Sequence, residues 1–107
     1  MEFIERDDVK RMLDAGDDFK LVFCLGDAEY TLKHIPGSIC ISDPKNAESH
    51  MHHDENIVVY CAGPDCLASA YAYEMMVRNG YTHVRRYLGG IYDWEEAGYP
   101  LEGELVS

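Results

Sequence analysis

Two cysteines five residues apart, Cys61 and Cys66, are the residues of this chain best suited to do chemistry. Cys61 follows the apolar run 57–60, and a helical pattern begins near Cys66. Where a buried strand ends facing the start of a helix, backbone N–H groups and the helix dipole favour negative charge. Thiols in such places ionise more readily than a free thiol, whose pKa is about 8.5. Cys61 is therefore the candidate nucleophilic thiolate.

Each cysteine also has a purely structural interpretation, because free cysteine is commonly a buried core residue. For Cys66 the functional alternative is a resolving thiol, which attacks Cys61 after persulfidation or oxidation and closes a disulfide. Its place on the same loop motivates that role, and both interpretations of Cys66 stay open. Cys24 and Cys40 lie in apolar stretches, which predicts core positions for them.

The six residues after Cys61 form the predicted active-site loop: Ala62, Gly63, Pro64, Asp65, Cys66 and Leu67. If this loop curls inward, its N–H groups form a nest that stabilises a thiolate or persulfide anion without a charged side chain. Pro64 removes one of these donors, and Gly63 gives the neighbouring backbone its freedom. None of the six residues carries a basic side chain.

The strong negative charge narrows the choice of partners. A formal net charge of -11 over 107 residues repels nucleic-acid phosphates and anionic membranes, so neither partner is expected. The same charge makes small free anions such as thiosulfate or phosphate poor substrates.

The charged N-terminus lacks the apolar segment of a signal peptide, and no stretch approaches the about 18 apolar residues of a membrane span. The four cysteines are also too few for the dense disulfide framework of a small secreted domain. The sequence therefore predicts a cytoplasmic protein.

Strand patterns alternate with helix patterns along the chain. Helices are predicted over 7–15, 27–33, 66–78 and 91–97, with Asp7 or Asp8 capping the first, and strands over 19–25, 38–41, 57–60 and 84–88. The polar stretch 43–56 is expected to be a loop or an irregular helix. This alternation predicts an α/β fold with a parallel sheet covered on both faces. In such sheets the active crevice lies beyond the carboxyl ends of the strands, where Cys61 is predicted to lie.

Three stretches of the chain, in the right order and spacing, resemble the rhodanese homology domain. They are EYTLKHIPGSICI (29–41), VVYCAGPDCLASA (58–70) and NGYTHVRRYLGGIYDWEEAGYP (79–100). The first is similar to an aromatic segment with a His-Ile-Pro-Gly turn, the second to the strand, cysteine and loop, and the third to the closing strand and tryptophan helix. The resemblance implies one rhodanese-like domain over 1–107. Its fold would be a three-layer sandwich with a mainly parallel five-stranded sheet, the short fifth strand falling near 2–4.

The activity that the resemblance implies is sulfur transfer without a cofactor. Cys61 would attack the sulfane sulfur of a donor, carry it as a persulfide and pass it to a thiol or other nucleophile. Two polar residues that are frequent in the family fall here on Phe23 and Leu25, and Lys33 stands where a glycine usually precedes the His. Together with the absence of a base beside Cys61, these differences make thiosulfate a doubtful donor. A small-molecule or protein-borne persulfide donor and a thiol acceptor are expected instead.

Two alternatives to the sulfurtransferase remain open from the sequence. One is a catalytically silent rhodanese-like module whose acidic surface binds a basic protein partner. The other is a thiol redox sensor that uses Cys61 and Cys66. Phosphatase and arsenate-reductase relatives close their cysteine loop with an arginine, which the six loop positions lack. His50, His52 and His53 share one polar stretch without a well-placed fourth ligand, so no metal site is expected.

Overall fold

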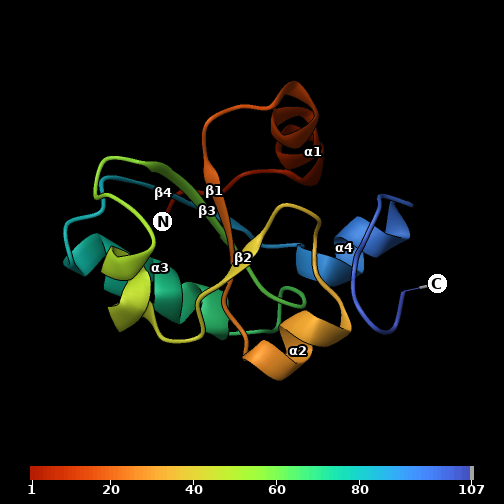
Figure 1. The fold of residues 1–107 in the computed structure, drawn as a ribbon. Coiled ribbons are helices and arrows are strands. Elements are labelled where there is room, and N and C mark those ends of the chain that lie inside the picture. Colours follow the sequence, from red (N-terminus) through yellow and green to blue (C-terminus); the bar gives the residue numbers. More distant parts are fainter. Residues whose placement is uncertain (107) are drawn as a thin grey trace.

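The sheet has four parallel strands, and its order places the strand before Cys61 in the interior. In the computed structural model, which describes residues 1–106, the strands are β1 (Lys20–Phe23), β2 (Ile39–Cys40), β3 (Asn56–Tyr60) and β4 (His83–Tyr87). They lie in the order β2-β1-β3-β4 (Figure 1). Because Phe23 pairs with Tyr60 and Tyr60 with Tyr87, the carboxyl ends of β1, β3 and β4 are level. Cys61 follows β3 at that edge.

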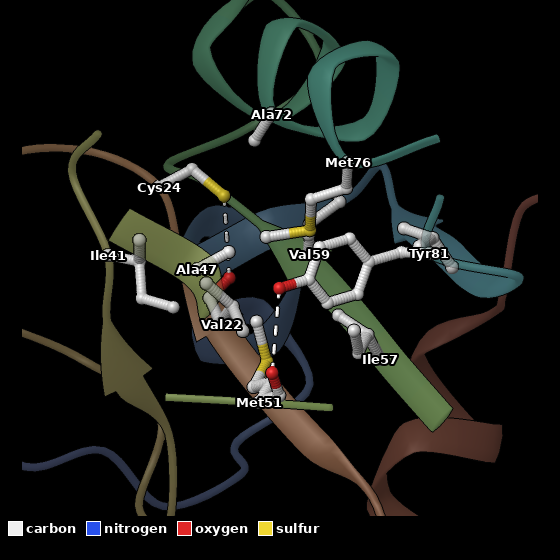
Figure 2. Packing of buried hydrophobic residues seen from close by; sticks show 11 residues of the cluster. Val22, Cys24, Ile41, Ala47, Met51, Ile57, Val59, Ala72, Met76 and Tyr81 are labelled. Atoms are coloured by element: carbon white, nitrogen blue, oxygen red, sulfur yellow. Dashed lines mark hydrogen bonds between the residues drawn. The ribbon is translucent and has the colours of Figure 1, made fainter. Parts of the chain in front are cut away.

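Helices cover both faces of this sheet, as the sequence predicts. They are α1 (Arg6–Ala15), α2 (Asp27–Leu32), α3 (Ala68–Arg78) and α4 (Gly90–Glu96), with one 3-10 helix, η1 (Pro44–Ser49). On one face Ala72 and Met76 of α3 pack against the sheet residue Val59 (Figure 2). On the other face Val9 of α1 and Trp94 of α4 belong to the second core cluster. No helix within residues 1–106 is long and apolar enough to cross a membrane.

The expected fifth strand is reduced to a single bridge. Phe3 forms an isolated parallel bridge with Arg86 of β4. Two backbone hydrogen bonds hold it: the Arg86 N–H donates to the Glu2 carbonyl over 2.9 Å, and the Ile4 N–H donates to the Arg86 carbonyl over 3.1 Å. The described residues therefore form four strands rather than five, because the chain turns into α1 at Arg6 before a second pair can form.

Two predicted helix starts are also wrong. The first helix begins at Arg6 with Glu5 at its N-cap, so Asp7 and Asp8 lie inside the first turn and cap nothing. The helix expected from Cys66 begins two residues later, at Ala68. The chain between Gly63 and Cys66 closes a turn in which the Cys66 N–H donates to the Gly63 carbonyl over 3.1 Å. Other element ends differ from the prediction by one or two residues, and part of the stretch 43–56 forms the irregular helix η1.

The last helix fixes the backbone just after β3. The Ile91 N–H donates to the Cys61 carbonyl over 3.1 Å, and the Tyr92 N–H donates to the Ala62 carbonyl over 2.9 Å. Such close approach requires glycine at the start of α4. Gly90 has a φ of 63°, and a Cβ there would lie 2.7 Å from the carbonyl carbon of Ala62.

We therefore expect Gly90→Ala to lower the free energy of unfolding by about 2–4 kcal/mol, because it adds a backbone clash to the strain of a left-handed conformation. Gly98 is the matched control, since its φ is 77° but a Cβ would meet nothing within 4 Å. Gly98→Ala should cost only about 1 kcal/mol, the strain alone. Urea denaturation of the two variants measures the difference. Equal losses would mean that the approach of α4 to the cysteine loop does not require glycine.

Candidate active site

A disulfide joins Cys61 to Cys66, so the structure brings the two candidate thiols together. Their Cα atoms are 6.3 Å apart, within the range that disulfides span. Cys61 is only 1% exposed at the end of β3, whereas Cys66 is half-buried. The pair occupies the carboxyl edge of the sheet, where open parallel sheets bind their ligands. In this state neither sulfur is a free thiol, and any nucleophilic role of Cys61 requires reduction first.

The other two cysteines are free, and their surroundings favour the neutral thiol. Burial raises the pKa of Cys24 to about 12, with the charge of Arg86 acting in the opposite direction. Cys40 is half-buried; desolvation and a hydrogen bond to the Asp27 carboxylate raise its pKa to about 11. Both thiols are therefore protonated near neutral pH, and Cys24 lies in the core as predicted.

Only one residue of the loop from Ala62 to Leu67 is fully buried. Gly63 is buried, and a Cβ on it would lie 2.8 Å from the ring of Tyr92. Pro64, Asp65 and Leu67 are exposed. The N–H of Cys66, one of the donors expected for an anion nest, is used by the carbonyl of Gly63. The first N–H groups of α4 likewise bind loop carbonyls, so these donors hold the backbone in shape.

A buried arginine lies under the loop, and its role was not among the sequence-based predictions. Arg86 of β4 is 7% exposed; its Nε donates to Ser69 Oγ over 2.8 Å and its Nη2 donates to the Cys66 carbonyl over 3.2 Å. The signal was present in the sequence. Two adjacent arginines interrupt an otherwise apolar strand, and since neighbouring residues of a strand point to opposite faces, one of them had to face each side of the sheet.

Large apolar side chains are exposed around the cysteine loop. We call them the apolar rim: Phe3, Leu67, Tyr71, Leu88 and Tyr92. A depression of ≈ 270 Å³ is bounded by loop residues 62–66 and Tyr92. A second, of ≈ 460 Å³, shares Pro64 with the first and is bordered by Phe3 and Leu88. Leu67 is 76% exposed and Tyr92 67%. Exposed apolar side chains that gather in one place often mark a binding surface.

The histidine stretch lies away from this edge of the sheet. His53 pairs with Glu48 over 3.3 Å and packs on the Tyr81 ring, with the two ring centroids 4.4 Å apart. Among residues 1–106, no three His, Cys, Asp or Glu side chains are grouped so that they could hold a metal ion.

Comparison with known proteins identifies the fold. The Alr3790 protein from Anabaena sp. is 25% identical, with a TM-score of 0.85 over 96% of this chain and 94% of that chain. A rhodanese-related protein from Thermoplasma volcanium is 24% identical, with a TM-score of 0.76 over 99% of this chain and 100% of that chain. A thiosulfate sulfurtransferase from Pseudomonas aeruginosa has a TM-score of 0.81 at 21% identity, over 96% of this chain but only 20% of its own.

These structures confirm the rhodanese-like α/β fold that the sequence predicted. At such low identity they are evidence for the fold alone. No curated protein matches the sequence significantly. The family model for the rhodanese-like domain, however, matches residues 5–97, which is most of the chain. The protein therefore belongs to the rhodanese-like domain family.

Proposed function

We propose that this protein is a sulfurtransferase that carries sulfane sulfur as a persulfide on Cys61. The observation that supports this most directly is the position of Cys61. It directly follows a central parallel strand and is joined by a disulfide to a second cysteine on the same loop. A cysteine that only filled the core would need no such partner. The proposed chemistry also requires a reducing compartment, the cytoplasm, where the disulfide returns to two thiols.

The proposed reaction proceeds by two displacements at sulfur. The Cys61 thiolate attacks the outer sulfur of a donor R–S–SH, the S–S bond of the donor breaks, and R–S⁻ leaves. An acceptor thiolate then attacks the outer sulfur of the Cys61 persulfide and regenerates the Cys61 thiolate. When no acceptor arrives, the Cys66 thiolate attacks the inner sulfur, closes the Cys61–Cys66 disulfide and releases HS⁻. Cys66 is thus a resolving thiol that empties the site.

A persulfide suits this surface better than thiosulfate does. Thiosulfate is a dianion, and residues 62–67 offer it no basic side chain, while the protein as a whole carries a net charge of -11. The apolar rim offers surface to the apolar parts of a small-molecule or protein-borne donor instead. We therefore propose a small-molecule or protein-borne persulfide as donor and a thiol as acceptor, with basic residues on a protein partner facing the acidic surface.

A thiol redox sensor is the second candidate, and the Cys61–Cys66 disulfide favours it. In that mechanism peroxide oxidises the Cys61 thiolate to a sulfenic acid. The Cys66 thiol then attacks the sulfenic sulfur, and water leaves as the disulfide forms. This chemistry needs no sulfur donor, which separates it from sulfur transfer.

Intact-mass measurement tests the first proposal. We expect reduced protein to gain the mass of one sulfur atom from glutathione persulfide, to gain little from thiosulfate, and to lose the gain in Cys61→Ser. In Cys66→Ser the added sulfur should persist for longer, because the resolving thiol is missing. A gain that survives in Cys61→Ser would refute the role of Cys61. No gain from any donor in Cys66→Ser, where the resolving thiol cannot empty the site, would instead favour a catalytically silent module that binds a partner.

Peroxide distinguishes the sensor. With peroxide and no persulfide, we expect the reduced protein to lose two hydrogens, and the loss should require both Cys61 and Cys66. Disulfide formation with peroxide, combined with no sulfur gain from any persulfide, would assign the sensor role and not sulfur transfer. If peroxide drives Cys61 to a sulfinic acid while Cys66 stays reduced, then Cys66 does not resolve the site.

The apolar rim predicts a donor preference. We expect Leu67→Ser to slow sulfur transfer from a persulfidated cysteine peptide with apolar flanking residues by about fivefold, the loss of roughly 1 kcal/mol of apolar contact. Transfer from cysteine persulfide should not change, since this donor is too small to cover Leu67. Leu105 is equally apolar and 67% exposed but borders neither depression at the cysteine loop, so Leu105→Ser is the control. Equal rates for all three proteins with the peptide would exclude the rim as a donor surface.

A further inference from the structure

Arg86 is a buried cation that has no carboxylate partner among the described residues. Its two side-chain hydrogen bonds go to neutral acceptors, Ser69 Oγ at 2.8 Å and the Cys66 carbonyl at 3.2 Å. None of the ion pairs formed within residues 1–106 includes it. Burying a guanidinium costs free energy, and proteins usually recover that cost by pairing it with a carboxylate. An arginine held this way, under a cysteine loop, calls for an explanation.

The two acceptors show what the guanidinium does to the loop. Ser69 lies in the first turn of α3 and is 1% exposed, so the helix and its burial hold its hydroxyl in place. Cys66 is half-buried and precedes the helix. Among residues 1–106, the other backbone hydrogen bond that holds it is the turn to Gly63. The planar fork of arginine can hold both acceptors at once. Arg86 thus ties the carbonyl of Cys66 to a rigid strand and a rigid helix.

We propose that Arg86 is a positioning residue for the cysteine pair: by holding Cys66 through its carbonyl, it keeps the Cys66 sulfur within reach of Cys61. Ring closure between two thiols depends on how much of the required geometry is already fixed before reaction. Arg86 therefore favours the closed disulfide over the open dithiol and speeds the resolving step. The inference rests on the proposed function only in calling closure the resolving step of sulfur transfer. Disulfide closure itself is independent of any sulfur donor.

The neighbouring Arg85 provides a matched control. It lies in the same strand, carries the same charge and points to the opposite face, where its Nη2 lies 3.7 Å from the sulfur of Met12. It makes no side-chain hydrogen bond to the cysteine loop. A substitution at Arg85 removes one positive charge from β4 while leaving Cys66 and Ser69 in place.

The test is the equilibrium with glutathione, in which the protein dithiol and oxidised glutathione give the protein disulfide and two reduced glutathione molecules. We expect Arg86→Met to lower the equilibrium constant for closure about tenfold, which raises the reduction potential of the pair by about 30 mV. Arg85→Met should match the unmodified protein. No change in Arg86→Met, or an equal change in both variants, would overturn the proposal.

Two further variants separate position from charge. Arg86→Lys keeps the charge but cannot hold two acceptors in one plane, so we expect it to resemble Arg86→Met; full recovery of the potential would overturn the positioning role in favour of charge. Ser69→Ala removes one acceptor and leaves the Cys66 contact. We expect it to lower the equilibrium constant for disulfide closure about threefold. Ser69→Ala also replaces Arg86→Met as the test if Arg86→Met lacks the circular dichroism spectrum of the folded protein. An unchanged reduction potential of the cysteine pair in Ser69→Ala would then overturn the proposal. Because no persulfide is present, a failed sulfur-transfer experiment leaves these results interpretable.

Discussion

Two backbone hydrogen bonds fix the place where chemistry is proposed. The first N–H groups of α4, from Ile91 and Tyr92, bind the carbonyls of Cys61 and Ala62. These hydrogen bonds therefore join α4 directly to the backbone that follows β3. Gly90 has to be a glycine for this contact to form, and the ring of Tyr92 then covers Gly63. The cysteine loop takes its shape from a helix that lies far away in the sequence.

The sequence was sufficient to predict this edge of the sheet. An apolar run that ends abruptly marks β3, because strands buried on both faces are apolar throughout. Since the carboxyl ends of parallel strands meet at one edge, the position of Cys61 followed from the strand assignment alone. The alternation of helices and strands gave the fold class, and the family match over residues 5–97 agrees with it. Local pattern and topology carried these inferences, and neither requires knowledge of side-chain contacts.

What the sequence did not reveal depends on distant partners. Arg86 was visible as an arginine within an apolar strand, but its acceptors belong to a loop and a helix that only the fold brings near it. The start of α3 was misplaced at Cys66 because helix periodicity does not register the turn that Gly63 closes. The family resemblance predicts a fifth strand, but the chain forms a single bridge to Arg86 before α1 begins at Arg6.

The arrangement of the loop also sets an order of events during synthesis. Both cysteines leave the ribosome before β4 and α4, which supply the buried cation and the N–H groups that frame them. A nascent chain that stops short of these elements carries two unframed thiols, with the reactivity of cysteines in an unfolded chain. During that interval, disulfide formation or oxidation of Cys61 and Cys66 depends on random encounters with Cys24, Cys40 and cellular oxidants. Control over Cys61 begins only when β4 and α4, which lie in the last quarter of the chain, have folded.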